Sequence, residues 1–322
     1  MHKIQTWHQQ IKQDLIIGHI SNKEIKVGES IQAKDLREVV FKRILADNPD
    51  FDKEQYITID ELNKYRRMEL FYRTLGEGQP VIILHGLMGS SDNWLTVSKP
   101  LAEQYKIYLV DQRNHGRSPW DNTMNYEVMA NDLWTFITQH QIEKPVIIGH
   151  SMGGKVAMKF ATEHPDLIAK LIVVDIAPRY YPPHHQDVLK GLHAITLANL
   201  QNRTEADQIL ATAIDSADVR QFLLKNLYRN EENQFAWRIN LAVIDQQIDQ
   251  IGEALLEHVR FDKPSLFIAG ALSDYITAAD KAMITSIFTN SKIVTIDNAN
   301  HWVQATQPAA FLAEVTAFID QK

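Results

Sequence analysis

The 322-residue sequence contains no cysteine. Disulfide bonds, thiolate catalysis and cysteine-ligated metal sites are therefore excluded, and any covalent mechanism must use another nucleophile. The sequence also lacks an apolar run long enough to cross a membrane, and its start lacks the apolar core and the small-residue cleavage site of a signal peptide. These absences predict a cytoplasmic protein with no membrane span.

A surplus of basic side chains is missing as well. The chain has 33 Lys and Arg against 40 Asp and Glu, and residues 68–322 alone carry 21 against 29. Nucleic-acid binding is therefore not expected, because phosphate backbones require clustered Lys and Arg. A hydrophobic content of 45% in a chain of this length supports a large core. We expect a globular protein with one large domain and additions, or with two domains.

Residues 1–67 are predicted to form a small helical extension of unknown role. The stretch AKDLREVVFKRILADNPDF has an apolar helical face, and Thr58–Glu61 fits a capping box that opens a helix to Tyr65. Short helices are seldom stable alone, so these are expected to pack on the main domain or to mediate association with another subunit. The sequence leaves the oligomeric state open.

From residue 68 onward, short apolar runs alternate with helical windows. The runs are β-branched and nearly continuous, which is typical of strands buried on both faces of a parallel sheet. The expected strands are MELFYRTLG, PVIILHG, KIYLVD, PVIIGH, KLIVVD, PSLFIAG and SKIVTID. Residues 68–322 are therefore predicted to form an α/β domain, with a mostly parallel sheet flanked by helices.

One connection in this domain is too long to be a loop. No clear strand lies between Asp175 and Lys263, whereas stretches such as DVRQFLLKNLYRN have helical patterns. We expect a helical cap insertion at about residues 178–262. It should lie over the carboxyl ends of the strands, where sites in such sheets form.

The segment Gly149–Gly153, GHSMG, matches the pattern G-x-S-x-G. It follows the apolar strand PVIIG and opens the helical stretch MGGKVAMKFATEHP, a context in which the serine hydroxyl stands exposed on a strained turn. A position at a helix N-terminus also favours an alkoxide or an oxyanion. Ser151 is therefore the candidate nucleophile, and a plain helix cap is the alternative.

A serine nucleophile needs a general base and an acid that orients the base. His301 follows the last expected strand, so it lies at the same sheet edge as Ser151 and can exchange the serine proton. Asp175 and Asp274 each follow a strand and stand between the serine and the histidine in the sequence. The residue pattern alone leaves the choice between these two acids open.

The oxyanion of an acyl-transfer reaction needs hydrogen-bond donors. The backbone N–H of Met152 follows the nucleophile, and that of Leu87 lies in the loop after the strand PVIILHG, where Gly86 allows close approach. These two groups are the expected oxyanion hole. His85 is expected to order the loop rather than to take part in catalysis, because His301 already supplies a base.

Several motifs, in this order, carry a resemblance to a known family: LHGLMGSSDNW, DQRNHGRSP, NYEVMANDL, IGHSMGGKVAM, VVDIAP, FLLKNL and HWVQATQP. With them, residues 68–322 resemble the α/β-hydrolase superfamily and, within it, the YbfF-type bacterial esterases. The resemblance implies an α/β-hydrolase fold and a serine hydrolase that cleaves small-molecule carboxylic esters or acyl thioesters, including acyl-CoA thioesters. It implies no metal and no organic cofactor.

The resemblance also bears on the acid. In YbfF-type esterases the aspartate of the DIAP segment accompanies the triad serine and histidine, with a further serine after the next-to-last strand. This implies Asp175 as the acid and Ser273 as an auxiliary residue. The sequence departs from that type by carrying Asp274 beside Ser273 and Asn300, where glycine is usual, before His301. Asparagine tolerates a left-handed backbone, so the loop is expected to keep its form.

Two further groups are candidates for substrate contacts. Arg113–Gly116 matches the family and is expected to form a structural turn, in which Arg113 meets either an anionic substrate or Asp111 in a buried ion pair. Apolar cap residues are expected to line an acyl pocket or to serve for internal packing. These cap residues are Phe222, Leu223, Leu227, Phe235 and Trp237.

Alternative functions belong to two classes. The same scaffold supports other reactions, such as C–C bond hydrolysis, perhydrolysis or lyase chemistry. Dehalogenation is disfavoured, because it uses an aspartate where this chain has Ser151. A non-catalytic binding protein with this fold is the other alternative, although a receptor has no need of a nucleophile, a base, an acid and an oxyanion hole together.

Overall fold

The computed structural model describes residues 30–32, 41, 44–45, 49–58, 68–255 and 258–321. The chain divides into two compact units, Met1–Met68 and Glu69–Lys322. Each unit is considered by itself, and the site described below lies wholly in the second.

In the first unit, the described residues include an antiparallel pair of strands, β1 (Ser30–Gln32) and β2 (Tyr56–Thr58). Only helices were expected in this part of the chain, and strands of 3 residues are too short for an alternating pattern to be recognised. Phe41 and Ile44 are helical and buried, within a stretch expected to be a helix. The second expected helix, from Thr58 to Tyr65, lies almost entirely outside the described residues.

The second unit is built on a seven-stranded sheet in the order β11-β10-β7-β6-β4-β5-β3. Edge strand β3 runs antiparallel to β5, and the other neighbouring pairs in this sheet are parallel. The strands are β3 (Tyr72–Leu75), β4 (Gln79–Leu84), β5 (Tyr105–Val110), β6 (Val146–His150), β7 (Lys170–Val174), β10 (Ser265–Gly270) and β11 (Ser291–Ile296). All seven strands expected from the apolar runs are present.

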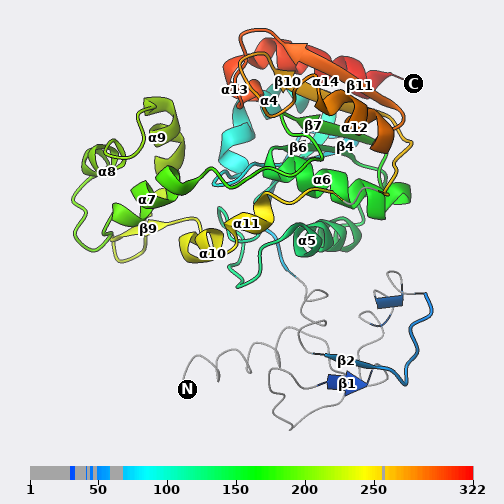
Figure 1. Ribbon diagram of the computed structural model, residues 1–322, viewed down its shortest axis with the longest axis horizontal. Helices are drawn as coiled ribbons and strands as arrows, with labels where there is room; N and C mark the ends of the chain where they lie inside the picture. The colour runs from blue at the N-terminus through cyan, green and yellow to red at the C-terminus, as the bar shows by residue number, and fades with distance from the viewer. Residues whose placement is uncertain are drawn as a thin grey trace. The chain divides into compact units, whose positions relative to one another are not determined.

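Helices cover both faces of this sheet (Figure 1). On one face, α4 (Leu95–Leu101), α13 (Val303–Thr306) and α14 (Pro308–Asp320) join the strands in one continuous apolar core. On the other, α5 (Tyr126–Gln139) and α6 (Met152–Glu163) pack against each other. The remaining helices outside the cap are η2 (Ser91–Trp94), η3 (Pro165–Leu167) and α12 (Asp280–Ile287). The predicted architecture, a mostly parallel sheet flanked by helices, is confirmed.

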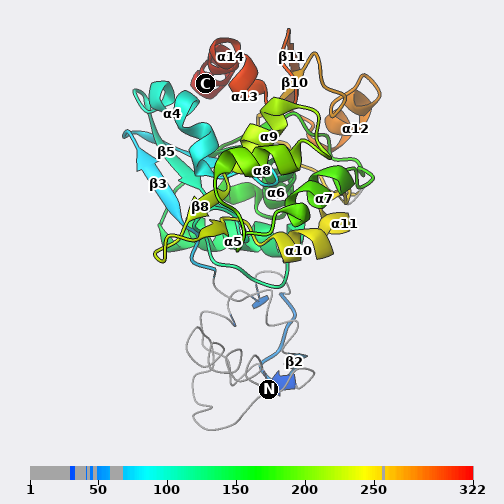
Figure 2. The same cartoon turned by 90° about the vertical axis from the view of Figure 1, so that its left-hand side faces the viewer.

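The chain between β7 and β10 forms the cap. Its elements are α7 (Gln186–Ala194), α8 (Arg203–Leu210), α9 (Ala217–Leu224), β8 (Leu227–Arg229), β9 (Phe235–Trp237), α10 (Leu241–Gln246) and α11 (Ile248–Ile251). In Figure 1 the cap lies to one side of the sheet, and in Figure 2, viewed from that side, α7, α8 and α9 stand in front of α6.

One feature of the cap was not predicted from the sequence. Strands β8 and β9 pair antiparallel across a short polar turn, where only helices were expected. Each strand has 3 residues, so a helical apolar spacing and a strand alternation cannot be distinguished over such a length. Leu227, Phe235 and Trp237 therefore belong to a hairpin rather than to a helix face.

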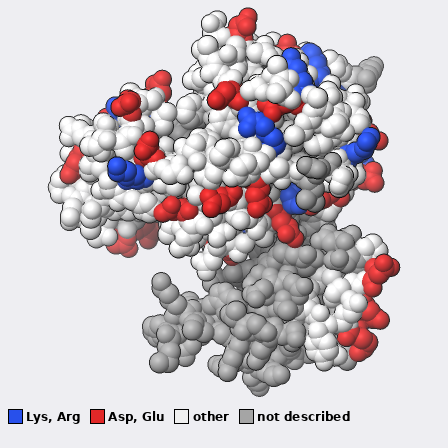
Figure 3. Space-filling view, in the orientation of Figure 1, with Lys and Arg blue, Asp and Glu red and all other residues white. Residues whose placement is uncertain are grey.

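The described surface has mixed charge. On the face shown in Figure 3, Lys and Arg lie in small separate groups among acidic side chains. None of the described helices is both long and apolar enough to cross a membrane.

Candidate active site

Ser151 stands on the sharp turn between β6 and α6. Its backbone has φ 51° and ψ −118°, a conformation that a non-glycine residue adopts only where the surrounding structure holds it. The turn is so tight that a Cβ on Gly149 would lie 2.2 Å from the carbonyl oxygen of Gly153. The two glycines of the pattern are therefore needed for the turn, and Ser151 lines a cavity.

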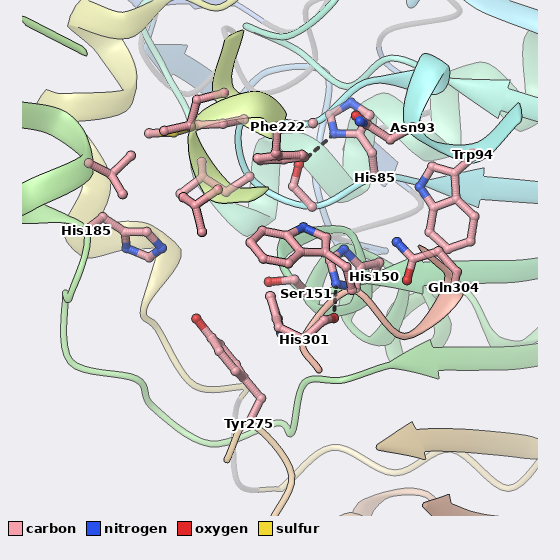
Figure 4. Close-up of a pocket in the computed structure, with 18 of the residues that line it drawn as sticks. His85, Asn93, Trp94, His150, Ser151, His185, Phe222, Tyr275, His301 and Gln304 are labelled. Atoms are coloured by element: carbon pink, nitrogen blue, oxygen red, sulfur yellow. Dashed lines mark hydrogen bonds between the residues drawn. The ribbon is translucent and has the colours of Figure 1, made fainter. Parts of the chain in front are cut away.

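His301 lies on the loop between β11 and α13, at the same cavity as Ser151 (Figure 4). Its Nδ1 is 2.8 Å from Oδ2 of Asp175, which directly follows β7. Asp175 is fully buried, and its Oδ1 accepts a 3.0 Å hydrogen bond from the Gly270 amide. A buried carboxylate at Nδ1 fixes the imidazole tautomer and leaves Nε2 able to accept a proton.

The two acids that the sequence left open occupy different environments. Asp274 is exposed, and its backbone carbonyl accepts a hydrogen bond from Arg179. Ser273 donates a 2.5 Å hydrogen bond to Oδ2 of Asp175. The structure thus groups Asp175 and Ser273 with His301 and leaves the carboxylate of Asp274 outside the group.

The two residues expected to supply the oxyanion donors border the same recess as Ser151. Leu87, Ser151 and Met152 line a common recess. Within the described residues, neither the Leu87 amide nor the Met152 amide donates a hydrogen bond to a protein acceptor. Leu87 and Met152 thus border the space next to Ser151, and their amides have no protein acceptor among the described residues.

Two buried histidines hold the loop that carries Leu87. Nε2 of His85 accepts a 2.9 Å hydrogen bond from the Gln112 amide, and its Nδ1 donates to the Gly86 carbonyl over 2.8 Å. Nε2 of His115 accepts a 3.0 Å hydrogen bond from the Met88 amide. Burial lowers the pKa of both histidines, that of His115 to about 3, so both stay neutral near pH 7. His85 orders the loop as expected, and His115 does so as well.

His150 connects the nucleophile turn to the loop that carries His301. Its Nε2 donates a 2.8 Å hydrogen bond to the His301 carbonyl, and the two ring centroids are 4.7 Å apart. Burial, together with the neighbouring His301, holds the pKa of His150 well below its usual value. A neutral His150 therefore fixes the main chain beneath His301, a role that the sequence analysis did not assign.

The expected ion pair of Arg113 with Asp111 is wrong. The buried Arg113 guanidinium forms a two-pronged pair with Asp132 on α5, at 2.6 Å and 2.8 Å. The Asp111 carboxylate instead accepts hydrogen bonds from the backbone N–H groups of Ser91 and Arg117. Asp132 presents both of its carboxylate oxygens to the planar guanidinium, which is the geometry that arginine favours. Arg113 lines neither of the two spaces beside Ser151, so a substrate contact is not supported.

A cavity of about 190 Å³ opens at Ser151 (Figure 4). Its apolar walls include Met88, Val188, Val219, Phe222, Leu223 and Trp302. Phe222 and Leu223 thus lie where an acyl pocket was expected. Leu227, Phe235 and Trp237 do not line the cavity, and all three are buried on the β8–β9 hairpin.

A narrower recess of about 30 Å³ shares Ser151 with this cavity. Its own walls are Tyr126, Met152, Ile176, Tyr181, Pro182, Pro183, Ile248, Ile251 and Gly252. Leu87, Ser151, His184, His185 and Tyr275 line both spaces. Ser151 therefore lies between a larger and a smaller space.

The loop before His301 differs in detail from the expectation. Asn300 does not have a positive φ, whereas Asn298 does, with φ 56°. The side-chain oxygen of Asn300 accepts a 2.9 Å hydrogen bond from the Trp302 amide. The loop thus accommodates asparagine through a side-chain hydrogen bond rather than through a left-handed backbone at that position.

Tyr275 and His184 were not singled out in the sequence. Tyr275 stands two residues after Ser273, and His184 lies in the segment that enters the cap. Their place in the loops that follow β10 and β7 was the only signal available, because aromatic and histidine side chains have many roles in loops. Both contribute to the walls beside Ser151.

Together, the fold and this site define a class of protein. A mostly parallel sheet carries a serine on the turn after one strand, and a histidine after another strand is paired with a buried aspartate. Within the part of the chain that the structure describes, no three His, Asp or Glu side chains are grouped so as to hold a metal ion. A serine on a strand-turn-helix, with a histidine and a buried aspartate at the same edge of the sheet, is the arrangement typical of α/β-hydrolases.

Comparisons with known proteins agree with this class. The family model described as the alpha/beta hydrolase fold matches residues 79–308, and the chain belongs to that family. The esterase YbfF of Escherichia coli (strain K12) is 35% identical over 243 residues, which cover 75% of this chain and 93% of YbfF. The sn-1-specific diacylglycerol lipase ABHD11 of Danio rerio is 35% identical over 257 residues, with 76% and 79% covered.

A solved structure described as a marine microorganism esterase has a TM-score of 0.76 and 43% identity, and covers 78% of this chain and 99% of that one. The α/β-hydrolase fold and the resemblance to YbfF-type esterases are confirmed by these findings. The prediction of a carboxylic ester hydrolase is confirmed at the level of enzyme class.

Proposed function

We propose that the protein hydrolyses carboxylic esters or acyl thioesters through an acyl-enzyme on Ser151, with His301 as general base and Asp175 as the orienting acid. The observation that carries the proposal is the contact between His301 Nδ1 and the buried Asp175 carboxylate, beside the cavity that Ser151 lines. An imidazole held in this way has its Nε2 lone pair available for the serine proton.

The reaction has two halves. Ser151 Oγ attacks the acyl carbonyl while His301 takes its proton, and the developing oxyanion accepts hydrogen bonds from the Met152 and Leu87 amides. Collapse of the tetrahedral intermediate expels an alcohol or thiol, which receives the proton from His301. Water then attacks the acyl-enzyme with His301 again as base, which releases the acid and restores Ser151.

The buried acid is supported by three donors. The Gly270 amide, the Ser273 hydroxyl and His301 Nδ1 all lie within hydrogen-bond distance of the Asp175 carboxylate. These hydrogen bonds satisfy the oxygens of a buried side chain and fix its orientation. The Asp175 carboxylate is therefore placed to orient His301 and to stabilise the imidazolium that forms in each half-reaction.

We assign the acyl group to the larger cavity and the leaving group to the recess. Phe222 and Trp302, with ring centroids 5.3 Å apart, give the larger space an apolar surface that suits an acyl chain. The narrower recess lies on the other side of Ser151, where it can receive the alcohol or thiol.

Substitution of the nucleophile tests the proposal. Ser151→Ala should reduce turnover of p-nitrophenyl butyrate by several powers of ten, and a fluorophosphonate probe should label the wild-type protein on Ser151. Ser286→Ala, on the exposed surface of α12, is a matched control and should leave the rate unchanged. Wild-type turnover in Ser151→Ala would contradict the proposal.

Parallel assays decide the substrate class. Butyryl-CoA and p-nitrophenyl butyrate carry the same acyl group, so their kcat/KM ratio reports the leaving group alone. Hydrolysis of the ester without the thioester would limit the function to esters. Failure of both substrates, with no adduct on Ser151, would favour a non-catalytic binding protein.

A further inference from the structure

The ring of Tyr275 stacks on the imidazole of His301. The two centroids are 4.0 Å apart, and the planes differ by 22°. Tyr275 belongs to the loop after β10, two residues beyond Ser273, and it lines both spaces beside the nucleophile (Figure 4). Rings at this separation are in van der Waals contact over their faces. The imidazole is thus restrained by a flat surface as well as by its hydrogen bond to Asp175.

Tyr275 is itself held at both ends. Its backbone carbonyl accepts a hydrogen bond from the Tyr181 hydroxyl, and its own hydroxyl lies 2.6 Å from Nε2 of His184. Burial raises the pKa of Tyr275 to about 12, so the phenol keeps its proton near neutral pH. Tyr181 and His184 both lie in the segment through which the chain enters the cap. The position of the Tyr275 ring therefore depends on that segment.

The stack extends beyond Tyr275. The ring of Tyr181 stacks on Tyr275 with centroids 5.4 Å apart and planes 26° apart. The Arg179 guanidinium lies 3.9 Å from the centroid of the Tyr181 ring. On α6, Nζ of Lys155 donates a 2.5 Å hydrogen bond to the Arg179 carbonyl. A continuous set of contacts thus connects the helix of the nucleophile, through the cap entry, to His301.

We propose that Tyr275 is a positioning residue for His301, and that the cap entry holds it in place through Tyr181. The inference rests on the proposed function, in which His301 is the general base. The ring restricts rotation of the imidazole, and its electron-rich face favours the imidazolium formed in both half-reactions. Both effects act in the transition state more than on substrate binding. Loss of the ring should therefore lower kcat and leave KM nearly unchanged.

Removal of the ring tests the proposal. In Tyr275→Leu, kcat for p-nitrophenyl acetate should fall about tenfold, with KM within about twofold of wild type. The acetyl group is small, so contacts with the cavity walls contribute little to this substrate. Tyr275→Phe keeps the ring and should stay within about threefold of the wild-type kcat. Tyr180→Leu is the matched control and should behave as wild type. Tyr180 is an exposed tyrosine in the segment through which the chain enters the cap.

Each result either supports or overturns the positioning role of Tyr275. An unchanged kcat in Tyr275→Leu, or a change in KM alone, overturns the proposal, because a residue that only lines the cavity would alter binding. Equal impairment of Tyr275→Phe and Tyr275→Leu also overturns it, since the hydroxyl rather than the ring would then carry the effect. If Tyr275→Leu does not fold, Tyr275→Met takes its place with the same expected fall. Ser151→Ala in the same assay separates the two proposals, because retained turnover there contradicts the proposed function and not only the role of Tyr275.

Discussion

Oδ2 of Asp175 lies 2.8 Å from Nδ1 of His301, and the Asp175 side chain has no exposed surface. The neighbouring candidate, Asp274, is exposed to solvent. An exposed carboxylate contributes little to imidazole orientation, because water competes for it and screens its charge. The two aspartates therefore differ in what their substitution should do.

Asp175→Asn should lower kcat by about 10⁴, because a neutral amide can hold the wrong imidazole tautomer and cannot stabilise the imidazolium. Steady-state kinetics with p-nitrophenyl butyrate measures this loss. Asp274→Asn makes the same chemical change one residue from Ser273 and should retain wild-type kcat. A large loss in Asp274→Asn, with little loss in Asp175→Asn, would assign the acid to the other carboxylate.

Ser273→Ala should reduce kcat about tenfold, since it removes one hydrogen bond to a buried charged oxygen. The Gly270 amide and His301 still contact the Asp175 carboxylate in this variant. The effect should therefore be much smaller than that of Asp175→Asn. Rates equal to wild type would mean that Ser273 has no auxiliary role in the reaction.

The sequence predicted the sheet and the turn that carries Ser151 because their signals are local. Runs such as VIIL and LIVV are apolar on both faces, and G-x-S-x-G constrains a single turn around Ser151. The choice between Asp175 and Asp274 is not local, because both follow a strand and only the distance to His301 separates them. The hairpin of β8 and β9 was missed for another reason, since its strands are too short to show a period.

The hydrogen-bond and ion-pair partners of buried polar groups could not be predicted from the sequence either. Arg113 stands two residues from Asp111, yet its guanidinium pairs with Asp132, which the chain brings alongside only when α5 packs. His115 was grouped with a structural turn, whereas it also holds the Met88 amide in the oxyanion loop. Such contacts arise from tertiary packing, which residue spacing does not encode.

Acid should destabilise the fold through its buried histidines. Burial lowers the pKa of His115 to about 3, whereas the unfolded chain has a histidine pKa near 6.5. Between these values the unfolded state binds a proton that the folded state does not, so the free energy of unfolding falls as the pH falls. The expected slope is about 1.4 kcal/mol per pH unit for each such histidine.

Urea unfolding at pH 7.5, 6 and 5 measures this slope. His115→Gln should reduce the slope of the unfolding free energy against pH by about the contribution of one histidine. His193→Gln is the control, because His193 is nearly half exposed and pairs with Asp245 on the surface. An identical slope in wild type and His115→Gln would mean that His115 takes up its proton equally in both states.

The acyl assignment predicts a change in chain-length preference. Phe222→Ala enlarges the cavity beside Ser151. The kcat/KM for p-nitrophenyl octanoate, divided by that for p-nitrophenyl butyrate, should therefore rise about fivefold. Phe235→Ala makes the same substitution on β9, outside the cavity, and should leave this ratio unchanged even if it lowers stability. An equal change in the two variants would contradict the placement of the acyl chain.

Lys155 is expected to hold the cap to the core. It is fully buried on α6, and its Nζ donates to the carbonyls of Arg179, over 2.5 Å, and Glu253, over 2.6 Å. Arg179 lies where the chain enters the cap and Glu253 lies near the end of the cap, so one Lys155 side chain contacts both segments that connect the cap to the sheet. Lys155→Met keeps the length of the side chain but leaves these carbonyls without a donor, at a cost of about 2 kcal/mol.

Two measurements should change together in Lys155→Met. The melting temperature should fall by about 5 °C, and KM for p-nitrophenyl butyrate should rise several-fold because the cap carries Phe222 and Leu223. Lys159→Met is the matched control on the same helix, where the lysine forms only a partly exposed pair with Glu163 and its loss should cost less than about 0.5 kcal/mol. A Lys155→Met variant with normal melting and normal KM would show that the cap is held by its apolar contacts alone.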